Sequence, residues 1–206
     1  MRARLALVAA GIDVELREVL LAHKPRQMLE ISAKATVPVL QLCCGKVLDE
    51  SIDILHWGLD HFDGRDYRRF GANRIKAERL IARNDGQFKS DLDRFKYATR
   101  FPDDDPMSSR SRAETFLDDL ERVLSLHDHL IDSVPSYADI AIFPFVRQFS
   151  RVDAEWFSST NYEGLRRWLA WWEQDHDFRA VMGKVQAWSP GDSSRSMFKS
   201  YGITAS

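Results

Sequence analysis

The sequence predicts a two-part fold, with a small α/β domain over residues 1–62 and an all-helical domain over residues 73–188. Three features support this prediction: an apolar hairpin pattern in the first quarter of the chain, a charged stretch with two glycines over residues 63–72, and helical periodicity from Asn73 nearly to the end. The charged stretch is expected to be the linker, and residues 189–206 an irregular tail.

The α/β domain is expected to begin with a helix and a strand. Met1–Ala10 consists of good helix formers and is followed by Gly11, a common residue just after a helix. Asp13–Leu21 alternates apolar and charged side chains, which predicts a strand. Residues 21–32 are expected to form a loop with one turn of helix.

A hairpin over Thr36–Ser51 is the central element of this domain. It is predicted to contain, in order, a strand at Val37–Leu42, a tight turn at Cys44-Gly45, a strand at Lys46–Leu48, and a helix start at Asp49-Glu50-Ser51.

The hairpin carries two features that suit ligand binding. Pro38 lacks a backbone N–H and belongs where a strand needs no donor, and it holds Val37 extended. The free N–H and C=O of Val37 can then pair with an extended ligand, as a sheet edge does. Ser51 and the first N–H groups of the following helix can bind an anion. Because one hairpin joins the two features, we expect them on the same side of the sheet.

The remaining elements are predicted to be helical. The helix from Ser51 to Phe62 has an apolar stripe, and the long helix from Asn73 should be bent or interrupted at Gly86. After a break at residues 100–109 a second long amphipathic helix follows. Ser136 and Asp139 form a capping box at the start of a central apolar helix, and residues 163–175 and 178–188 complete the helical domain.

Composition and charge exclude several classes of protein. The 206 residues carry 29 basic and 31 acidic side chains, without a basic stripe for nucleic acid. No apolar run is long enough to span a membrane, and no pattern indicates a metal site. The only two cysteines, Cys43 and Cys44, are adjacent and would close no useful loop, which favours a reducing cytoplasm.

Val37-Pro38-Val39-Leu40 followed by Asp49-Glu50-Ser51 resembles the glutathione site of the glutathione S-transferase family. The order and spacing of both motifs agree, and so does the Ser136–Asp139 capping box in a helical second domain. The resemblance implies a thioredoxin-like N-terminal domain, a cis proline and a site in the cleft between domains.

The resemblance to the cysteine-type classes (omega and glutaredoxin-2-like bacterial) also implies that the first strand and the segment with the catalytic cysteine are missing. The Met1-Arg2-Ala3-Arg4 stretch matches the residues that directly follow that segment. Loss of an interior strand would leave the Asp13–Leu21 and Val37–Leu42 strands unpaired, at about 1–3 kcal/mol for each buried unsatisfied group. We therefore expect the natural product to start upstream; a naturally shorter, remodelled protein is the alternative.

The resemblance assigns roles to particular residues. Glutathione is expected to pair with the backbone of Val37 beside Pro38, and its γ-glutamyl end to meet Glu50 and the Ser51 N–H. Lys24 is expected at the glycyl carboxylate, although a solvated surface lysine fits its position equally well. The wall of the second-substrate site is expected to include Arg94, Tyr97 and Phe101.

With an upstream cysteine, a thiolate at a helix N-terminus would form and release mixed disulfides with glutathione. The expected activity is therefore thiol transfer or deglutathionylation on a small electrophile or mixed disulfide. The form without that cysteine would be inactive or impaired. A non-catalytic binding module and a conjugating transferase with a serine or tyrosine remain alternatives, and a homodimer is the expected assembly.

Overall fold

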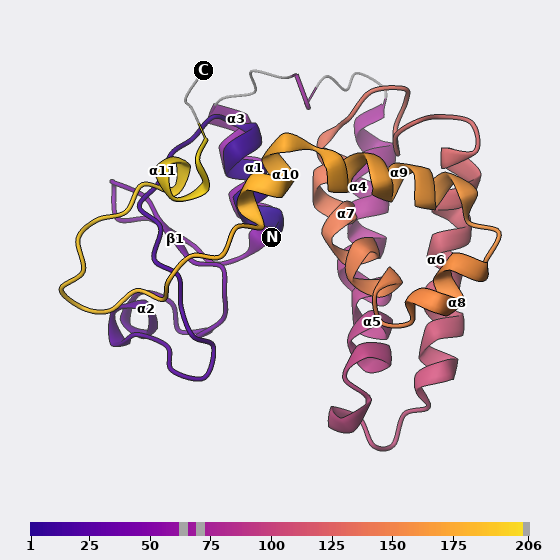
Figure 1. Cartoon of the computed structure of the whole chain (residues 1–206), viewed down its shortest axis with the longest axis horizontal. Coiled ribbons are helices and arrows are strands. Elements are labelled where there is room, and N and C mark those ends of the chain that lie inside the picture. The colour runs from indigo at the N-terminus through magenta and orange to yellow at the C-terminus, as the bar shows by residue number, and fades with distance from the viewer. Residues whose placement is uncertain (62–65, 69–72, 204–206) are drawn as a thin grey trace. The chain divides into compact units, whose positions relative to one another are not determined.

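The computed structural model of the chain describes residues 1–61, 66–68 and 73–203. These residues separate into two compact units, one formed by Met1–Asp66 with Asp175–Ser206 and the other by Tyr67–Gln174. Figure 1 shows the elements of both units. Most of the linker expected at residues 63–72 lies outside the described residues.

The first unit combines helices with one small hairpin. Its elements are α1 (Arg2–Ala9), α2 (Arg26–Ile31), β1 (Leu40–Gln41), β2 (Val47–Leu48), α3 (Ser51–His61), α10 (His176–Val181) and α11 (Met197–Tyr201). Strands β1 and β2 are antiparallel, with Leu40 opposite Leu48 and Gln41 opposite Val47. Both predicted hairpin strands exist but are shorter than expected. Helix α1 ends as predicted, because Gly11 adopts a φ of 67° that suits glycine.

The core of the first unit joins segments that are distant in sequence. Apolar side chains of α1, α3, β2, α10 and α11 form one buried cluster, which includes Leu7, Ile54, Leu48, Val181 and Phe198. Packing of α1 against α3 therefore depends on residues from both ends of the chain.

The segment expected as a strand at Asp13–Leu21 forms no regular strand in the described structure. Its apolar positions are nevertheless directed into the core, since Leu16 is buried and Val14 packs on the same cluster. Its partner is the C-terminal segment: Glu15 and Ser196 form an isolated antiparallel bridge. The backbone N–H of Leu16 donates to the carbonyl of Arg195 at 2.7 Å, and Met197 N–H donates to the Val14 carbonyl at 2.8 Å.

The second unit contains helices joined by loops, with no strand among its described residues. It contains α4 (Arg74–Arg83), the π-helical turn η2 (Asn84–Phe88), α5 (Lys89–Lys96), the 3₁₀ turn η3 (Ala98–Arg100), α6 (Pro106–Leu124), α7 (Tyr137–Ser150), α8 (Ala154–Ser159) and α9 (Glu163–Gln174). The π turn includes Gly86, so the predicted interruption of the first long helix occurs at that residue.

Helix α7 is the most buried helix of this unit. Ten of its residues are buried, and the predicted capping box is present, since the Ser136 and Asp139 side chains satisfy each other's backbone N–H groups. Phe149 of α7 lies 5.5 Å from Phe88 and 5.4 Å from Phe95 between ring centroids, and Phe143 packs on Trp168 and Trp172 of α9. The aromatic side chains of neighbouring helices thus enclose α7.

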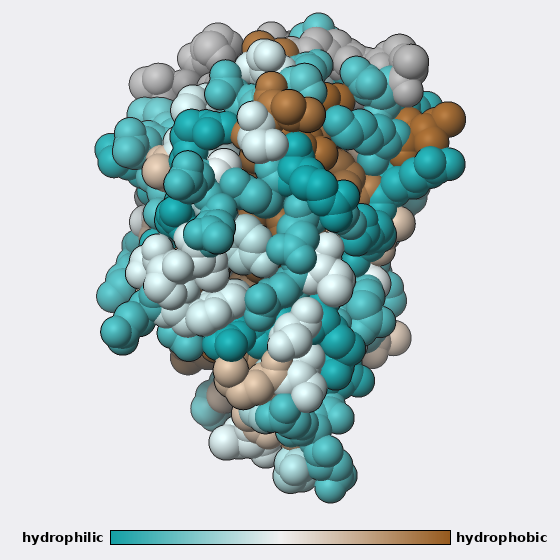
Figure 2. Space-filling model, turned by 90° about the vertical axis from the view of Figure 1, so that its right-hand side faces the viewer, coloured by the Kyte–Doolittle hydropathy of each residue, from teal (hydrophilic) through white to brown (hydrophobic). Residues whose placement is uncertain are grey.

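The exterior is mostly polar where the space-filling view shows it. In Figure 2, hydrophilic residues cover most of the visible face, and hydrophobic residues gather toward its upper part. Within the described residues, no helix combines the length and the apolar character that crossing a membrane would require.

Candidate functional site

The Val37–Pro38 peptide bond is cis, as the resemblance implies. Val37 is 46% exposed, and β1 begins only at Leu40. Among the described residues, neither the N–H nor the C=O of Val37 has a hydrogen-bond partner. An extended ligand could therefore pair with this backbone without displacing a strand.

The other part of the hairpin site is the N-terminus of α3. Helix α3 begins at Ser51 and follows β2 after only two residues, so the hairpin fixes where its first N–H groups lie. Glu50, which directly precedes the helix, is exposed, and Ser51 is half-buried. Unpaired N–H groups and the helix dipole make such a position favourable for a carboxylate.

An ion-pair cluster holds the residues at this helix start. Lys34 Nζ lies 2.8 Å from Glu50 Oε1 and 3.0 Å from Asp49 Oδ1, and the Ser32 hydroxyl donates to Asp49 Oδ2 at 2.9 Å. Hydrogen bonds to Glu50 and Asp49 raise the pKa of Lys34 to about 12. The hydrogen bonds from Lys34 and Ser32 in turn hold the pKa of Asp49 below its usual range. Lys34 therefore stays charged at neutral pH and neutralises part of the acidic pair.

A buried arginine approaches the same helix start from α1. Arg2 is 4% exposed, and its guanidinium donates to Ser51 Oγ at 3.3 Å. The contact links α1 to the first residue of α3 and adds positive charge beside the helix N-terminus. A carboxylate bound at Ser51 would be stabilised by both.

Sequence reasoning included Asp49 in the motif at the helix start but missed Arg2, Ser32 and Lys34 as neighbours of the site. Lys34 lies in no motif, and the stretch that contains Arg2 gave no sign of a contact with Ser51; only the fold brings Lys34 to Glu50 and Arg2 to Ser51.

Lys24 lies in the loop before α2 and is half-buried. No hydrogen bond or ion pair within the described part of the chain holds its ammonium group. The structure therefore does not join Lys24 to Glu50 or Ser51, although all three belong to the first unit.

The residues expected at a second-substrate wall lie in the second unit, at the end of α5 and just beyond it. The Arg94 guanidinium lies 5.5 Å from the centroid of the Phe101 ring, and its Nε donates to Asp104 Oδ2 at 2.7 Å. The Lys96 ammonium and the Arg100 guanidinium each lie 4.7 Å from the centroid of the Tyr97 ring. Arg94 and Phe101 are thus in contact, and Tyr97 belongs to an adjoining aromatic and cationic cluster.

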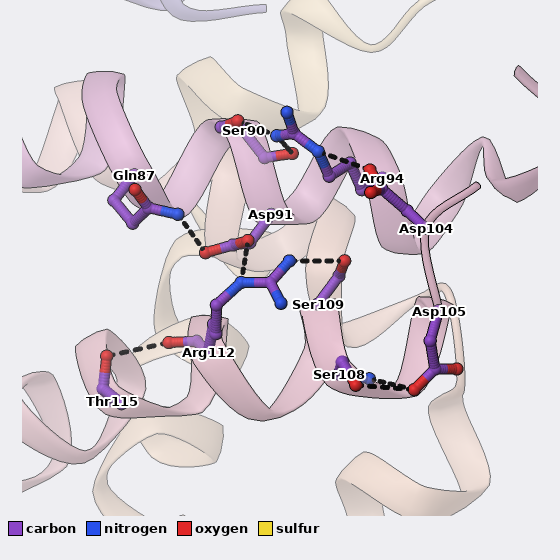
Figure 3. A network of polar contacts seen from close by, with 10 residues as sticks. All are labelled: Gln87, Ser90, Asp91, Arg94, Asp104, Asp105, Ser108, Ser109, Arg112 and Thr115. Atoms are coloured by element: carbon purple, nitrogen blue, oxygen red, sulfur yellow. Dashed lines mark hydrogen bonds and ion pairs between the residues drawn. The ribbon is translucent and has the colours of Figure 1, made fainter. Parts of the chain in front are cut away.

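A polar network anchors this part of α5 to α6 (Figure 3). Asp91 is completely buried and accepts from Arg112 Nε and from Gln87 Nε2, each at 2.8 Å. Arg112 also donates to Ser109 Oγ at 2.9 Å. The network fixes the two helices, so Arg94, one turn after Ser90, projects from a rigid support.

A separate hollow of about 590 Å³ lies along one face of α4 in the second unit. Its lining residues are Ile75, Lys76, Arg79, Leu80 and Arg83, none of which belongs to the predicted site. Among the described residues, no group of three or more histidine, cysteine or acidic side chains is arranged to hold a metal ion.

Comparisons with known proteins identify the family to which both parts of the chain are similar. Residues 1–66 match the family model "Glutathione S-transferase, N-terminal domain", and residues 80–170 match "Glutathione S-transferase, C-terminal domain". No curated protein sequence gives a significant match.

Several solved structures share the fold. The chain resembles BphK, a bacterial GST, in its ternary complex with a TM-score of 0.72 and 20% identity, over 87% of this chain and 90% of that one. The chain resembles a glutathione S-transferase from Rhodospirillum rubrum F11 with a TM-score of 0.71 and 19% identity, over 89% of this chain and 87% of that one. For glutathione transferase F2 from Populus trichocarpa the TM-score is 0.70 and the identity 17%, over 88% of this chain and 91% of that one.

Proposed function

The chain belongs to the glutathione S-transferase family, and we propose that it binds glutathione through the hairpin and the first turn of α3. The observation that carries this proposal is the pairing of two features on one short hairpin. Within the described part of the chain, the exposed backbone of Val37 before Pro38 has no hydrogen-bond partner. After the second strand, Glu50 directly precedes α3 and Ser51 begins it.

Each part of glutathione has a proposed partner. The cysteinyl backbone pairs with the N–H and C=O of Val37, which Pro38 holds extended. The γ-glutamyl carboxylate binds the Ser51 N–H at the start of α3, with Arg2 nearby, and the γ-glutamyl ammonium binds Glu50. Lys24 is proposed to bind the glycyl carboxylate from the loop before α2.

Binding of the ligand's ammonium group to Glu50 would compete with the ion pair between Lys34 and Glu50. Lys34 Nζ already bridges Asp49 and Glu50, so it can stay on Asp49 while the ligand takes the second carboxylate. Two carboxylates then serve two ammonium groups, and no charge is left unpaired. This arrangement makes Glu50 available without moving the hairpin.

The finer proposal is thiol transfer in a form that carries a cysteine upstream of Met1. Cys43 and Cys44 lie at the hairpin turn, at least three residues along the chain from the paired residues Leu40 and Leu48. Neither is proposed to serve as the catalytic thiol. The second substrate is proposed to lie against Arg94, Tyr97 and Phe101, and the protein is proposed to work in the cytoplasm as a homodimer.

A non-catalytic module that binds glutathione or a partner protein is the second candidate. The exposed Val37 backbone supports it, because backbone pairing needs no thiol. Reading the codons upstream of Met1 and assaying an extended chain for reduction of a glutathione mixed disulfide separates the two functions. Turnover by the extended chain supports the enzyme, and binding without turnover supports the module.

Calorimetric titration with glutathione tests the proposed site. Glu50→Gln should weaken binding about tenfold, because it replaces a charge-assisted hydrogen bond with a neutral one. The matched control is Glu30→Gln, which changes an exposed glutamate that pairs with Arg26 on α2. If the Glu50 variant bound glutathione with the affinity of the wild type, Glu50 would not be part of the binding site.

A further inference from the structure

We infer that Cys43 and Cys44 at the tip of the hairpin form a binding site for thiophilic trivalent arsenicals, which bond two sulfur atoms at once. This site goes beyond the proposed glutathione function and does not depend on it. The inference rests on the exposure of both thiols, on the geometry of the turn that carries them, and on the number of sulfur atoms available.

The exposure of this pair is unusual for cysteine. Free cysteine is among the most buried residue types and usually behaves as a small apolar side chain. Cys43 and Cys44 are the only cysteines of the sequence, and both are free and exposed. Within the described residues neither thiol has a hydrogen-bond partner. Packing therefore gives no reason for cysteine at these positions, and both thiols are accessible to a ligand.

The turn carries the two cysteines at consecutive positions of its corner. Gly45 N–H donates to the Leu42 carbonyl at 2.9 Å, so Cys43 and Cys44 are the central residues of a β-turn. Leu42 N–H donates to the Lys46 carbonyl at 2.8 Å, and Gly45 has a φ of 85°, which together give a type I turn followed by a glycine bulge. Strands β1 and β2 hold both ends of the turn, so the backbone keeps the two cysteines at its two central positions.

Two sulfur atoms select the class of ligand. Zinc in structural sites takes four protein ligands, and the described residues offer no group of three or more metal-binding side chains. A monosubstituted trivalent arsenical has two exchangeable positions and needs only two sulfurs. Phenylarsine oxide reacts with two thiols to form two As–S bonds, and its oxygen leaves with both thiol protons as water. Arsenic remains trivalent, so the step needs no oxidant or reductant.

Adjacency of the thiols predicts retention against a competing monothiol. Once one sulfur has bonded to the arsenic, the second sulfur is held close to it at a high effective concentration. The affinity of the pair for the arsenical therefore exceeds that of a single thiol by about 10²–10⁴. The adduct should therefore survive an excess of 2-mercaptoethanol and be removed by the dithiol 2,3-dimercaptopropanol.

The test is intact-mass analysis of the reduced protein after phenylarsine oxide treatment and a 2-mercaptoethanol challenge. The wild type should keep one phenylarsine group, and Cys43→Ser and Cys44→Ser should each lower retention about 100-fold. Serine suits a turn, so circular dichroism should show both variants folded. Retention by either single variant, or loss of the group from the wild type, would overturn the inference.

A matched variant separates adjacency from the number of thiols. Cys44→Ser combined with Ser158→Cys keeps two exposed thiols but moves one to α8 of the second unit. This double variant should behave like Cys44→Ser alone. If it instead retained the arsenical as the wild type does, two accessible thiols would suffice and the hairpin pair would not be a site.

Discussion

At the scale of single residues, buried acidic side chains of the second unit stabilise helix ends and contacts. Asp139 is fully buried and accepts four hydrogen bonds: from the backbone N–H of Leu130 and Ser136, the Ser136 hydroxyl, and Trp168 Nε1. Its carboxylate thus ties the capping box of α7 to the preceding loop and to α9. The residue contributes to folding, as its place in the sequence motif predicts.

Asp139→Ala should lower the free energy of unfolding by about 3–5 kcal/mol, because several buried donors lose their partner. Urea unfolding at neutral pH measures the change. Asp103→Ala, at an exposed loop position, should stay within about 0.5 kcal/mol of the wild type. Equal effects of the two substitutions would show that the buried network contributes little.

The role of Lys24 can be tested by shortening the ligand. γ-Glutamylcysteine lacks the glycyl carboxylate that Lys24 is proposed to bind. Lys24→Met should weaken glutathione binding about tenfold and leave γ-glutamylcysteine binding unchanged. Calorimetry with both ligands measures this difference, and a variant that binds glutathione as well as the wild type does would show Lys24 to be a surface lysine.

At the scale of elements, the C-terminal segment packs with the N-terminal unit. Asp13 accepts from the Ser196 hydroxyl at 2.5 Å and from the Phe198 N–H at 2.9 Å, at the start of α11. Burial by itself would raise the pKa of Asp13. The hydrogen bonds from Ser196 and Phe198 outweigh burial, so the pKa of this carboxyl lies below its usual value. This carboxylate therefore stabilises the fold in its charged form.

The stability due to Asp13 should depend on pH. A lowered pKa in the folded state means that the contribution is present above the unfolded pKa of about 3.9 and is lost as pH falls through the folded value. Asp13→Asn should therefore be less stable than the wild type at pH ~7, with the difference shrinking below pH ~4.

Urea unfolding at several pH values tests this dependence. Glu15→Gln, which changes an exposed pair with Arg17 on the same segment, should cost little at any pH. A constant difference between Asp13→Asn and the wild type across the pH range would contradict the role of the charge.

Sequence patterns predicted the elements better than their partners. The alternation in residues 13–21 correctly indicated which side chains face the core, such as Leu16, but wrongly indicated a regular strand. The partner of this segment lies near Ser196, in a tail whose small polar residues show no period. Long-range pairing of this kind leaves no local signal, and the same holds for the contact of Lys34 with Glu50.

At the scale of the whole molecule, two units with different cores carry separate parts of the proposed function. The residues proposed to bind glutathione, Val37, Glu50 and Ser51, all lie in the first unit, and the proposed wall residues lie in the second. Solved structures at about 20% identity share this fold. The family fold was predictable because motif spacing and helix periodicity agree with it.

The central claim is that glutathione binds at the hairpin and the start of α3. An amide proton–nitrogen correlation spectrum of the labelled protein, titrated with glutathione, tests it most directly. The account predicts saturable shifts at the amides of Val37, Glu50 and Ser51, while Leu126, exposed in the second unit, stays unmoved. If saturating glutathione left all three amides unmoved, the hairpin would not be the glutathione site.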